Sequence, residues 1–140
     1  MKVSPRHKAR ELAMQALYSW QMSGNAVEQI ELAIATSNDM QKVDMSFFQD
    51  ILRNALQNLE DLDKAVKPYL GRLPEEIDPV EKAIIRVATY ELVHRIDVPY
   101  KVVINEAIEL AKEFGAADSH KFVNGVLDKA VKTFRKDERT

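Results

Sequence analysis

The sequence predicts an all-α protein, with helical bundles packed together in a single domain that spans residues 1–140. Apolar residues recur at helical spacing through most of the chain, and the pairs Ser4-Pro5 and Asp78-Pro79 are typical of helix starts. The alternating apolar and polar runs that are typical of strands are missing. A chain of 140 residues is long enough to bury a substantial core. These features together predict about seven helices joined by short loops.

Two helices are predicted before residue 40. Ser4 should be the N-cap of the first helix, with Pro5 in the first helical position, because this pair satisfies and preorganises a helix start. The helix should run to about Met22, where the Gly-Asn pair at 24–25 stops it. The second helix should cover roughly residues 26–37 and end in the polar stretch that follows.

In the middle of the chain, the sequence predicts one longer helix followed by a short one. The longer helix should start near Asp44 or Ser46, because apolar residues share one face from there onward. These residues are Phe48, Ile51, Leu52, Ala55, Leu59 and Leu62. Pro68 interrupts the pattern, since proline removes a backbone donor, and a short helical piece over about 69–73 should follow.

The clearest helix start lies at Asp78. This residue should be the N-cap, with Pro79 in the first helical position and Glu81 completing a capping box. Apolar residues then follow helical spacing until the Asp-Val-Pro break at 97–99.

Two more helices complete the chain. One should run from about Tyr100 to Phe114 and end at Gly115 as a left-handed C-cap. The last should start at Asp118 or Ser119 and run to about 134, leaving a frayed tail at 135–140.

The composition favours a protein without catalytic or metal-binding chemistry. The chain has no cysteine, which excludes disulfides and thiolate sites and fits a cytoplasmic protein, and no apolar run could span a membrane. His7, His94 and His120 are far apart and without a helical i+4 metal partner, and the glycines form no phosphate-binding loop. Glu91 and the Asn-Glu pair at 105–106 lie in apolar surroundings and should form hydrogen bonds between helices. We therefore expect neither an enzyme nor a cofactor or metal site.

The charges are distributed unevenly although the net charge is only −2. Residues 1–10 form a basic arm without a single acid. Its cations are Lys2, Arg6, Lys8 and Arg10. Cations are disfavoured at a helix N-terminus, so a chain that places them there favours an anionic partner.

The position of Phe122 allows two alternative roles for its ring, helix packing or nucleic-acid binding. The apolar stripe of its helix consists of Val123, Val126, Leu127, Ala130 and Phe134. Phe122 lies about 100° from the centre of that stripe, beside Lys121. A flank aromatic commonly packs against another helix, whereas a ring beside lysines is also how single-stranded nucleic acid is held.

Two further aromatic residues fit the second alternative. Tyr18 lies off the apolar stripe of its helix, downstream of the basic arm, and Tyr69 with Arg72 forms an aromatic–cation pair near Pro68. RNA or single-stranded DNA is therefore the leading ligand class. A protein–protein adaptor whose aromatic flank docks a partner helix, and a homo-oligomer that buries Tyr18 and Phe122, are the rival interpretations.

Three segments resemble the NusB family of bacterial transcription antitermination factors. They are "ARELAMQALYSWQMS", "EKAIIRVATYEL" and above all "DVPYKVVINEAIELAKEFGAADSHKFVNGVLDK" at 97–129. The resemblance covers nearly the whole chain and is weakest at 25–45 and after 132. It implies a fold of two three-helix bundles. It also implies a non-enzymatic factor that binds boxA, a single-stranded RNA element of ribosomal RNA operon transcripts, with the ribosomal protein NusE, in a termination-resistant RNA polymerase complex.

The resemblance also implies site residues. The basic arm of the family corresponds to Lys2, Arg6, His7, Lys8 and Arg10, and its other RNA-contacting positions correspond to Tyr18, Tyr69, Phe114, Asp118, Lys121 and Phe122. Arg72, Glu75 and Glu81 are the candidates for contact with NusE. His7 and Lys8 depart from the denser arginine run of the family, and neither forms the bidentate phosphate contact of arginine.

Overall fold

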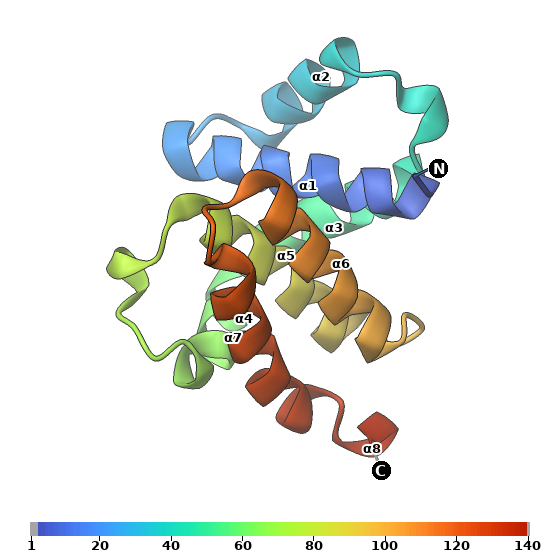
Figure 1. Cartoon of the computed structure of the whole chain (residues 1–140). Coiled ribbons are helices and arrows are strands. Elements are labelled where there is room, and N and C mark those ends of the chain that lie inside the picture. The colour runs from blue at the N-terminus through green and yellow to red at the C-terminus, as the bar shows by residue number, and fades with distance from the viewer. Residues whose placement is uncertain (1–2, 140) are drawn as a thin grey trace.

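The computed structural model describes residues 3–139, and every regular element in that range is a helix, so the all-α prediction is confirmed. The α-helices are α1 (Pro5–Ser23), α2 (Val27–Ser37), α3 (Met45–Gln57), α4 (Leu59–Val66), α5 (Pro79–His94), α6 (Tyr100–Phe114), α7 (Ser119–Phe134) and α8 (Lys136–Arg139) (Figure 1). Short 3-10 turns lie at η1 (Met40–Lys42), η2 (Lys67–Tyr69) and η3 (Pro74–Glu76). Within the described range, no helix is long and apolar enough to cross a membrane.

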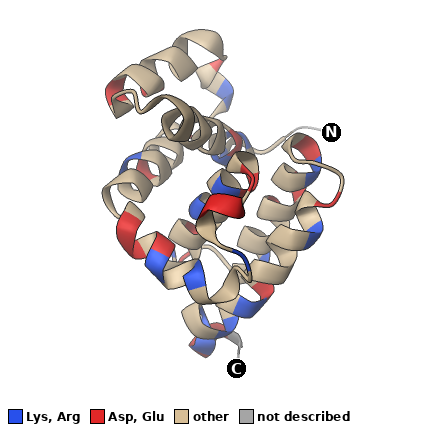
Figure 2. Ribbon diagram, turned by 90° about the vertical axis from the view of Figure 1, so that its left-hand side faces the viewer, with Lys and Arg blue, Asp and Glu red and all other residues tan. Residues whose placement is uncertain are grey.

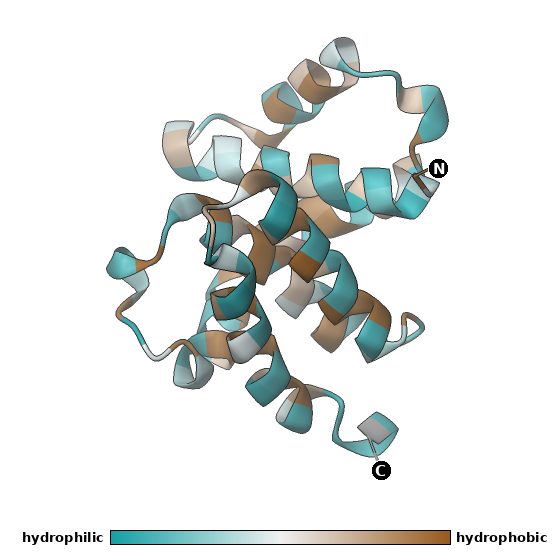
Figure 3. Cartoon of the chain, in the orientation of Figure 1, coloured by the Kyte–Doolittle hydropathy of each residue, from teal (hydrophilic) through white to brown (hydrophobic). Residues whose placement is uncertain are grey.

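The helix α5 is the centre of the domain. It packs against α1 and α3 on one side and against α6 and α7 on the other, while α2 packs on α1 and α4 on α5. The buried apolar residues form one core around this centre, where hydrophobic segments gather on α5 and α6 (Figure 3). Because α5 packs against both pairs of helices, the division into two three-helix bundles stays a prediction.

The helix starts follow the sequence signals except at Glu81. Its carboxylate accepts a hydrogen bond from the Ser119 hydroxyl and does not complete the predicted capping box with Asp78. The side chain of Ser4 accepts a hydrogen bond from the backbone N–H of His7 at 3.0 Å, and Pro5 begins α1 as predicted. The side chain of Asp78 accepts from the backbone N–H groups of Val80 and Glu81 at 2.8 and 3.3 Å. These caps fix where α1 and α5 begin, and therefore which of their side chains face the surface.

The prediction of one long helix after Asp44 is wrong in one respect, because that stretch breaks at Asn58. The helix α3 ends at Gln57 and α4 begins at Leu59. The Asn58 side chain donates to the carbonyl oxygen of Asn54 at 2.8 Å, which competes with the helical backbone ladder. The short helix predicted over about 69–73 is also wrong: turns occupy 67–69 and 74–76, and Gly71 between them has a left-handed φ of 65°.

The predicted left-handed cap at Gly115 is wrong as well. Its φ is −92° and its ψ is 179°, which is extended backbone that any residue adopts. Glycine is needed here for space instead. A Cβ atom at this position would lie 2.6 Å from the Cβ of Ser119 and 2.8 Å from the carbonyl oxygen of Ala111. The absence of a side chain therefore lets α7 start close against the end of α6.

Gly115→Ala is expected to lower the free energy of unfolding by about 1–3 kcal/mol, the usual cost of overpacking a close contact. Urea unfolding followed by circular dichroism measures this change. The matched control is Gly125→Ala on the exposed side of α7, where an added Cβ meets nothing within 4 Å. That control should stabilise the protein by about 0.5–1 kcal/mol, since alanine favours a helix interior over glycine. Equal stability of both variants would contradict the steric role of Gly115.

The predicted frayed tail is wrong for Arg135 and Glu138. Arg135 is only 4% exposed and lies against the C-terminal end of α5. The carboxylate of Glu138 accepts a hydrogen bond from the backbone N–H of Tyr100 at 2.9 Å. The C-terminal segment is thus part of the packed domain.

Candidate nucleic-acid interface

The basic arm divides into exposed and buried cations. Lys2 lies outside the described residues. The Arg6 side chain is 45% exposed, contacts Asp44 at 3.5 Å, and places its guanidinium 4.4 Å from the ring centre of Phe47. Lys8 lies 2.7 Å from the carboxylate of Glu11 and is 37% exposed. Arg6 and Lys8 therefore remain accessible to an anion at the N-terminal end of α1.

Arg10 is different, and the prediction that it belongs to an exposed arm is wrong. It is 3% exposed, and its Nε donates to both carboxylate oxygens of Glu91 at 3.0 and 2.9 Å. Burial raises the pKa of the Glu91 carboxyl, and the hydrogen bond and charge of Arg10 oppose that rise. The expectation that Glu91 joins helices is confirmed, because this pair connects α1 with α5.

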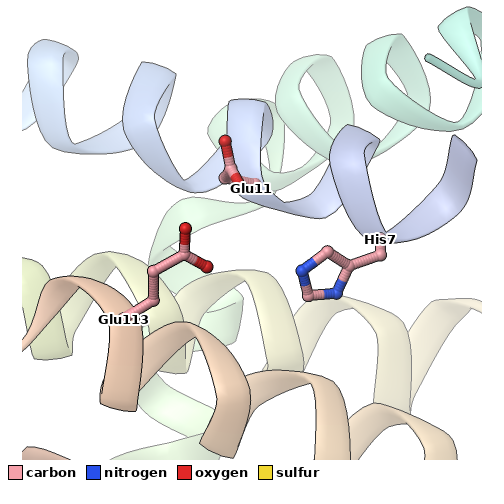
Figure 4. A group of neighbouring side chains, drawn as sticks. All are labelled: His7, Glu11 and Glu113. Atoms are coloured by element: carbon pink, nitrogen blue, oxygen red, sulfur yellow. The ribbon is translucent and has the colours of Figure 1, made fainter. Parts of the chain in front are cut away.

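His7 is held between α1 and α6. Its Nδ1 is hydrogen-bonded to the carboxylate of Glu106, so the expected interhelical role of Glu106 is confirmed. Glu11 stands four residues after His7, on the same face of α1. Ligand atoms of His7, Glu11 and Glu113 all lie within 4.8 Å of one another (Figure 4). The prediction that no histidine has a helical i+4 metal partner is therefore wrong for His7.

The strongest cation–aromatic contact near the start of α7 joins Arg72 and Phe122. The Arg72 guanidinium carbon lies 4.0 Å from the centre of the Phe122 ring. Phe122 is half-buried and packs against the core, so the packing interpretation of this ring is confirmed, while its role as a platform for nucleic acid stays a prediction. Arg72 lies 3.7 Å from the Glu81 carboxylate, which accepts a hydrogen bond from the Ser119 hydroxyl at 2.7 Å. We call Arg72, Glu81, Ser119 and Phe122 the Phe122 cluster.

Lys121 does not provide the cation on the Phe122 ring. Its ammonium pairs instead with Asp118 at 3.4 Å, and the two side chains are 73% and 81% exposed. Such an exposed pair contributes little stability and gives way easily to another charged ligand. The Lys121 ammonium therefore lies exposed to solvent beside the Phe122 cluster.

Tyr69 does not pair with Arg72, so that predicted aromatic–cation pair is wrong. The Tyr69 hydroxyl is hydrogen-bonded to the Thr133 hydroxyl at 2.7 Å, and its ring meets Phe134 edge-on at 6.1 Å. Tyr69 is half-buried near the C-terminal end of α7, whereas Phe122 is near the N-terminal end. The sequence gives no sign of this separation, since the turns around Gly71 decide it.

The remaining predicted residues differ in exposure. Tyr18 is 37% exposed on α1, Phe114 is half-buried at the end of α6, and Glu75 is exposed in η3. Glu81 is only 7% exposed. This carboxylate is bonded to Ser119 and lies 3.7 Å from Arg72, so it holds the Phe122 cluster together, and its contact with NusE stays a prediction.

Charges on the visible face of the domain are mixed. Figure 2 shows lysine and arginine interspersed with aspartate and glutamate along the helices, without one continuous basic band. The exposed cations are therefore local groups, with Arg6 and Lys8 at the start of α1 and Arg72 and Lys121 near Phe122.

The chain is similar to known proteins along nearly its whole length. The model of the NusB family matches residues 7–132. The chain is 70% identical over 139 residues to the transcription antitermination protein NusB of Alteromonas mediterranea, covering 99% of each chain, and 70% identical over 138 residues to that of Pseudoalteromonas atlantica, again with 99% of each covered.

Solved structures agree with the fold. The NusB structure of T. maritima is 33% identical, with a TM-score of 0.84 and 99% of each chain covered. A structure of the antitermination factors NusB and NusE in complex with double-stranded RNA has a TM-score of 0.80 at 21% identity, covering 90% of this chain and 95% of that one. At that identity the second likeness bears on the fold alone.

Proposed function

The chain belongs to the NusB family of transcription antitermination factors, which are not enzymes, and from that premise we propose that it binds single-stranded boxA RNA of ribosomal RNA transcripts. NusE would bind the same protein, and the two would act together in a termination-resistant RNA polymerase complex. The observation that carries the proposal is the Phe122 cluster: a half-open aromatic ring beside Arg72 and Lys121.

The RNA side of the proposal uses two kinds of contact. Bases would stack on the open part of the Phe122 ring, a contact worth roughly 1–3 kcal/mol, with Tyr18, Tyr69 and Phe114 as the other aromatic candidates. Phosphates would meet the exposed cations. These are Arg6, Lys8 and Lys121, with Lys2 beyond the described residues. Four such contacts predict that the logarithm of the binding constant falls with the logarithm of salt concentration with a slope of about −3.

The surface that would bind NusE adjoins the surface that would bind RNA at Arg72. This side chain is 46% exposed although it contacts both Phe122 and Glu81. Glu75 is exposed in the same connection between α4 and α5. Arg72 and Glu75 could therefore meet NusE directly, while Glu81 would act through its hold on Arg72 and Ser119.

Phe122→Leu is expected to weaken binding to boxA RNA by about 5- to 150-fold, because leucine keeps the apolar volume but removes the flat ring. Fluorescence anisotropy with a boxA strand and a scrambled strand, across a salt series and with and without NusE, measures this. The control is Tyr100→Leu, which removes another half-buried ring at the start of α6, next to Glu138 of α8. Its affinity for RNA should stay within about twofold, well inside the stacking increment.

The rival functions give different results in the same experiment. A protein–protein adaptor would bind both strands equally and weakly, and Phe122→Leu would change only the affinity for NusE. A free protein that buries Tyr18 and Phe122 in a homodimer would show twice the monomer mass by light scattering and would lose that dimer when RNA is added. Equal binding of boxA and scrambled strands by the wild type contradicts the proposal.

A further inference from the structure

We propose that His7, Glu11 and Glu113 bind a divalent transition-metal ion of the zinc class. One ligand atom from each residue lies within 4.8 Å of the other two. The side chains come from α1 and α6 and lie between these helices (Figure 4). An imidazole nitrogen with two carboxylates is a ligand set that suits zinc and its neighbours better than magnesium or calcium, which prefer oxygen alone.

A second observation supports metal binding by the imidazole of His7. Its Nδ1 is hydrogen-bonded to the carboxylate of Glu106, which lies outside the three-residue group. When Nδ1 carries the proton, Nε2 keeps its lone pair, and this is the form of imidazole that binds a metal. A carboxylate on the far nitrogen is the usual orienting contact of metal-bound histidines. Glu106 therefore acts as a positioning residue for His7.

The local charge also favours a cation. Four carboxylates gather here, those of Glu11, Glu91, Glu106 and Glu113. Lys8 pairs with Glu11, Arg10 pairs with Glu91 and lies 3.8 Å from Glu106, and the charge of Arg95 also acts on Glu91. Among the described residues Glu113 has no ion pair, and a divalent ion would compensate its charge.

Lys8 competes with the metal ion for the carboxylate of Glu11. Its ammonium lies 2.7 Å from one oxygen of Glu11 and is 37% exposed, so the lysine can turn into water when a metal binds. In a tetrahedral site, two atoms bound to one zinc ion at about 2.1 Å lie about 3.4 Å apart. A spacing of up to 4.8 Å therefore requires the ligand atoms to move closer by up to about 1.4 Å. Rotation of the long and exposed side chain of Glu113 allows this movement.

The site would keep an open coordination position. Glu11 and Glu113 line an open groove of about 910 Å³, together with Ser4, Lys8 and Lys42. Three protein ligands and an open fourth position are typical of zinc sites that exchange water or bind a further ligand. This inference concerns metal binding by the chain itself and does not rest on the proposed function.

Isothermal titration calorimetry of the full-length protein with Zn²⁺ should show one saturable site per chain, with Mg²⁺ binding at least about a hundredfold more weakly. Co²⁺ in the same site should give visible absorption bands that Zn²⁺ displaces. Glu113→Gln removes one ligand from an exposed position and should weaken zinc binding at least about tenfold, with an unchanged melting temperature in the absence of metal. His7→Gln should weaken it as much.

The matched control is Glu109→Gln, an exposed glutamate one turn earlier on α6 that is outside the site. Its zinc affinity should stay within about twofold of the wild type. The proposal is overturned if the wild type shows no saturable one-to-one zinc binding. It is equally overturned if Glu113→Gln binds zinc as well as the wild type does, or if Glu109→Gln loses as much affinity as Glu113→Gln.

Discussion

Arg10→Ala is expected to lower the free energy of unfolding by about 3–5 kcal/mol, which is the range for removing one partner of a buried ion pair. Arg10 is 3% exposed and Glu91 is 1% exposed. The variant leaves the Glu91 carboxylate buried without its partner, and it also removes the guanidinium that lies 4.9 Å from the centre of the Phe47 ring. Urea unfolding at neutral pH measures the loss.

The loss should depend on pH in a defined direction. Burial raises the pKa of Glu91, and Arg10 is the main group that lowers it. Without Arg10 the folded-state pKa lies further above the unfolded value, so the folded variant takes up a proton as pH falls. The stability deficit of Arg10→Ala should therefore be full at about pH 8 and shrink towards about pH 5.

Arg6→Ala is the control for the Arg10 experiment. Arg6 belongs to the same helix and also lies over Phe47, but its side chain is 45% exposed. Its removal should cost less than about 1 kcal/mol, as for other surface ion pairs. The double variant Arg10→Ala, Glu91→Ala should lose less than the sum of the two single variants, because neither charge is then left alone. Additive losses would contradict the ion pair as the cause.

Local sequence signals predicted most of the fold because they act within one helix. The caps at Ser4 and Asp78 and the apolar periodicity of α5 depend only on residues a few positions apart. Arg10 shows that local signals do not predict contacts between helices. It stands three residues before Ala13 and seven before Leu17, on the buried face of α1, yet it was grouped with the exposed arm by sequence proximity. Its partner is 81 residues away and becomes adjacent only when α1 packs on α5.

The sequence points to Phe122 as a candidate site residue but not to the residues that it pairs with. Phe122 was identified as a flank aromatic beside a cation, but that cation is Arg72, from the connection between α4 and α5, and not the adjacent Lys121. The turns around Gly71 determine where Arg72 points, and a turn of this kind has no periodic signal. The grouping of His7 with Glu113 likewise depends on how α6 packs against α1.

Arg135→Ala should be the second severe change, with an expected loss of about 3–4 kcal/mol in the free energy of unfolding, because charged hydrogen bonds to buried groups are costly to remove. The Arg135 guanidinium donates to the carbonyl oxygens of Leu92 at 2.6 Å, Glu91 at 3.1 Å and Arg95 at 3.0 Å. These carbonyls belong to the last turn of α5 and to the residue after it, where the helix dipole also favours a cation. The variant leaves them without this donor.

Two controls separate this capping role from the charge of the C-terminal segment. Lys136→Ala removes the neighbouring exposed cation and should change stability by less than about 0.5 kcal/mol. Arg135→Lys keeps the charge but loses the planar fork that reaches several carbonyls at once, so it should recover only part of the loss. If Arg135→Lys were as stable as the wild type, charge alone would explain the effect. If Arg135→Ala unfolded at the same urea concentration as the wild type, the C-terminal segment would not be holding the end of α5, and the frayed tail predicted by the sequence would be the better description.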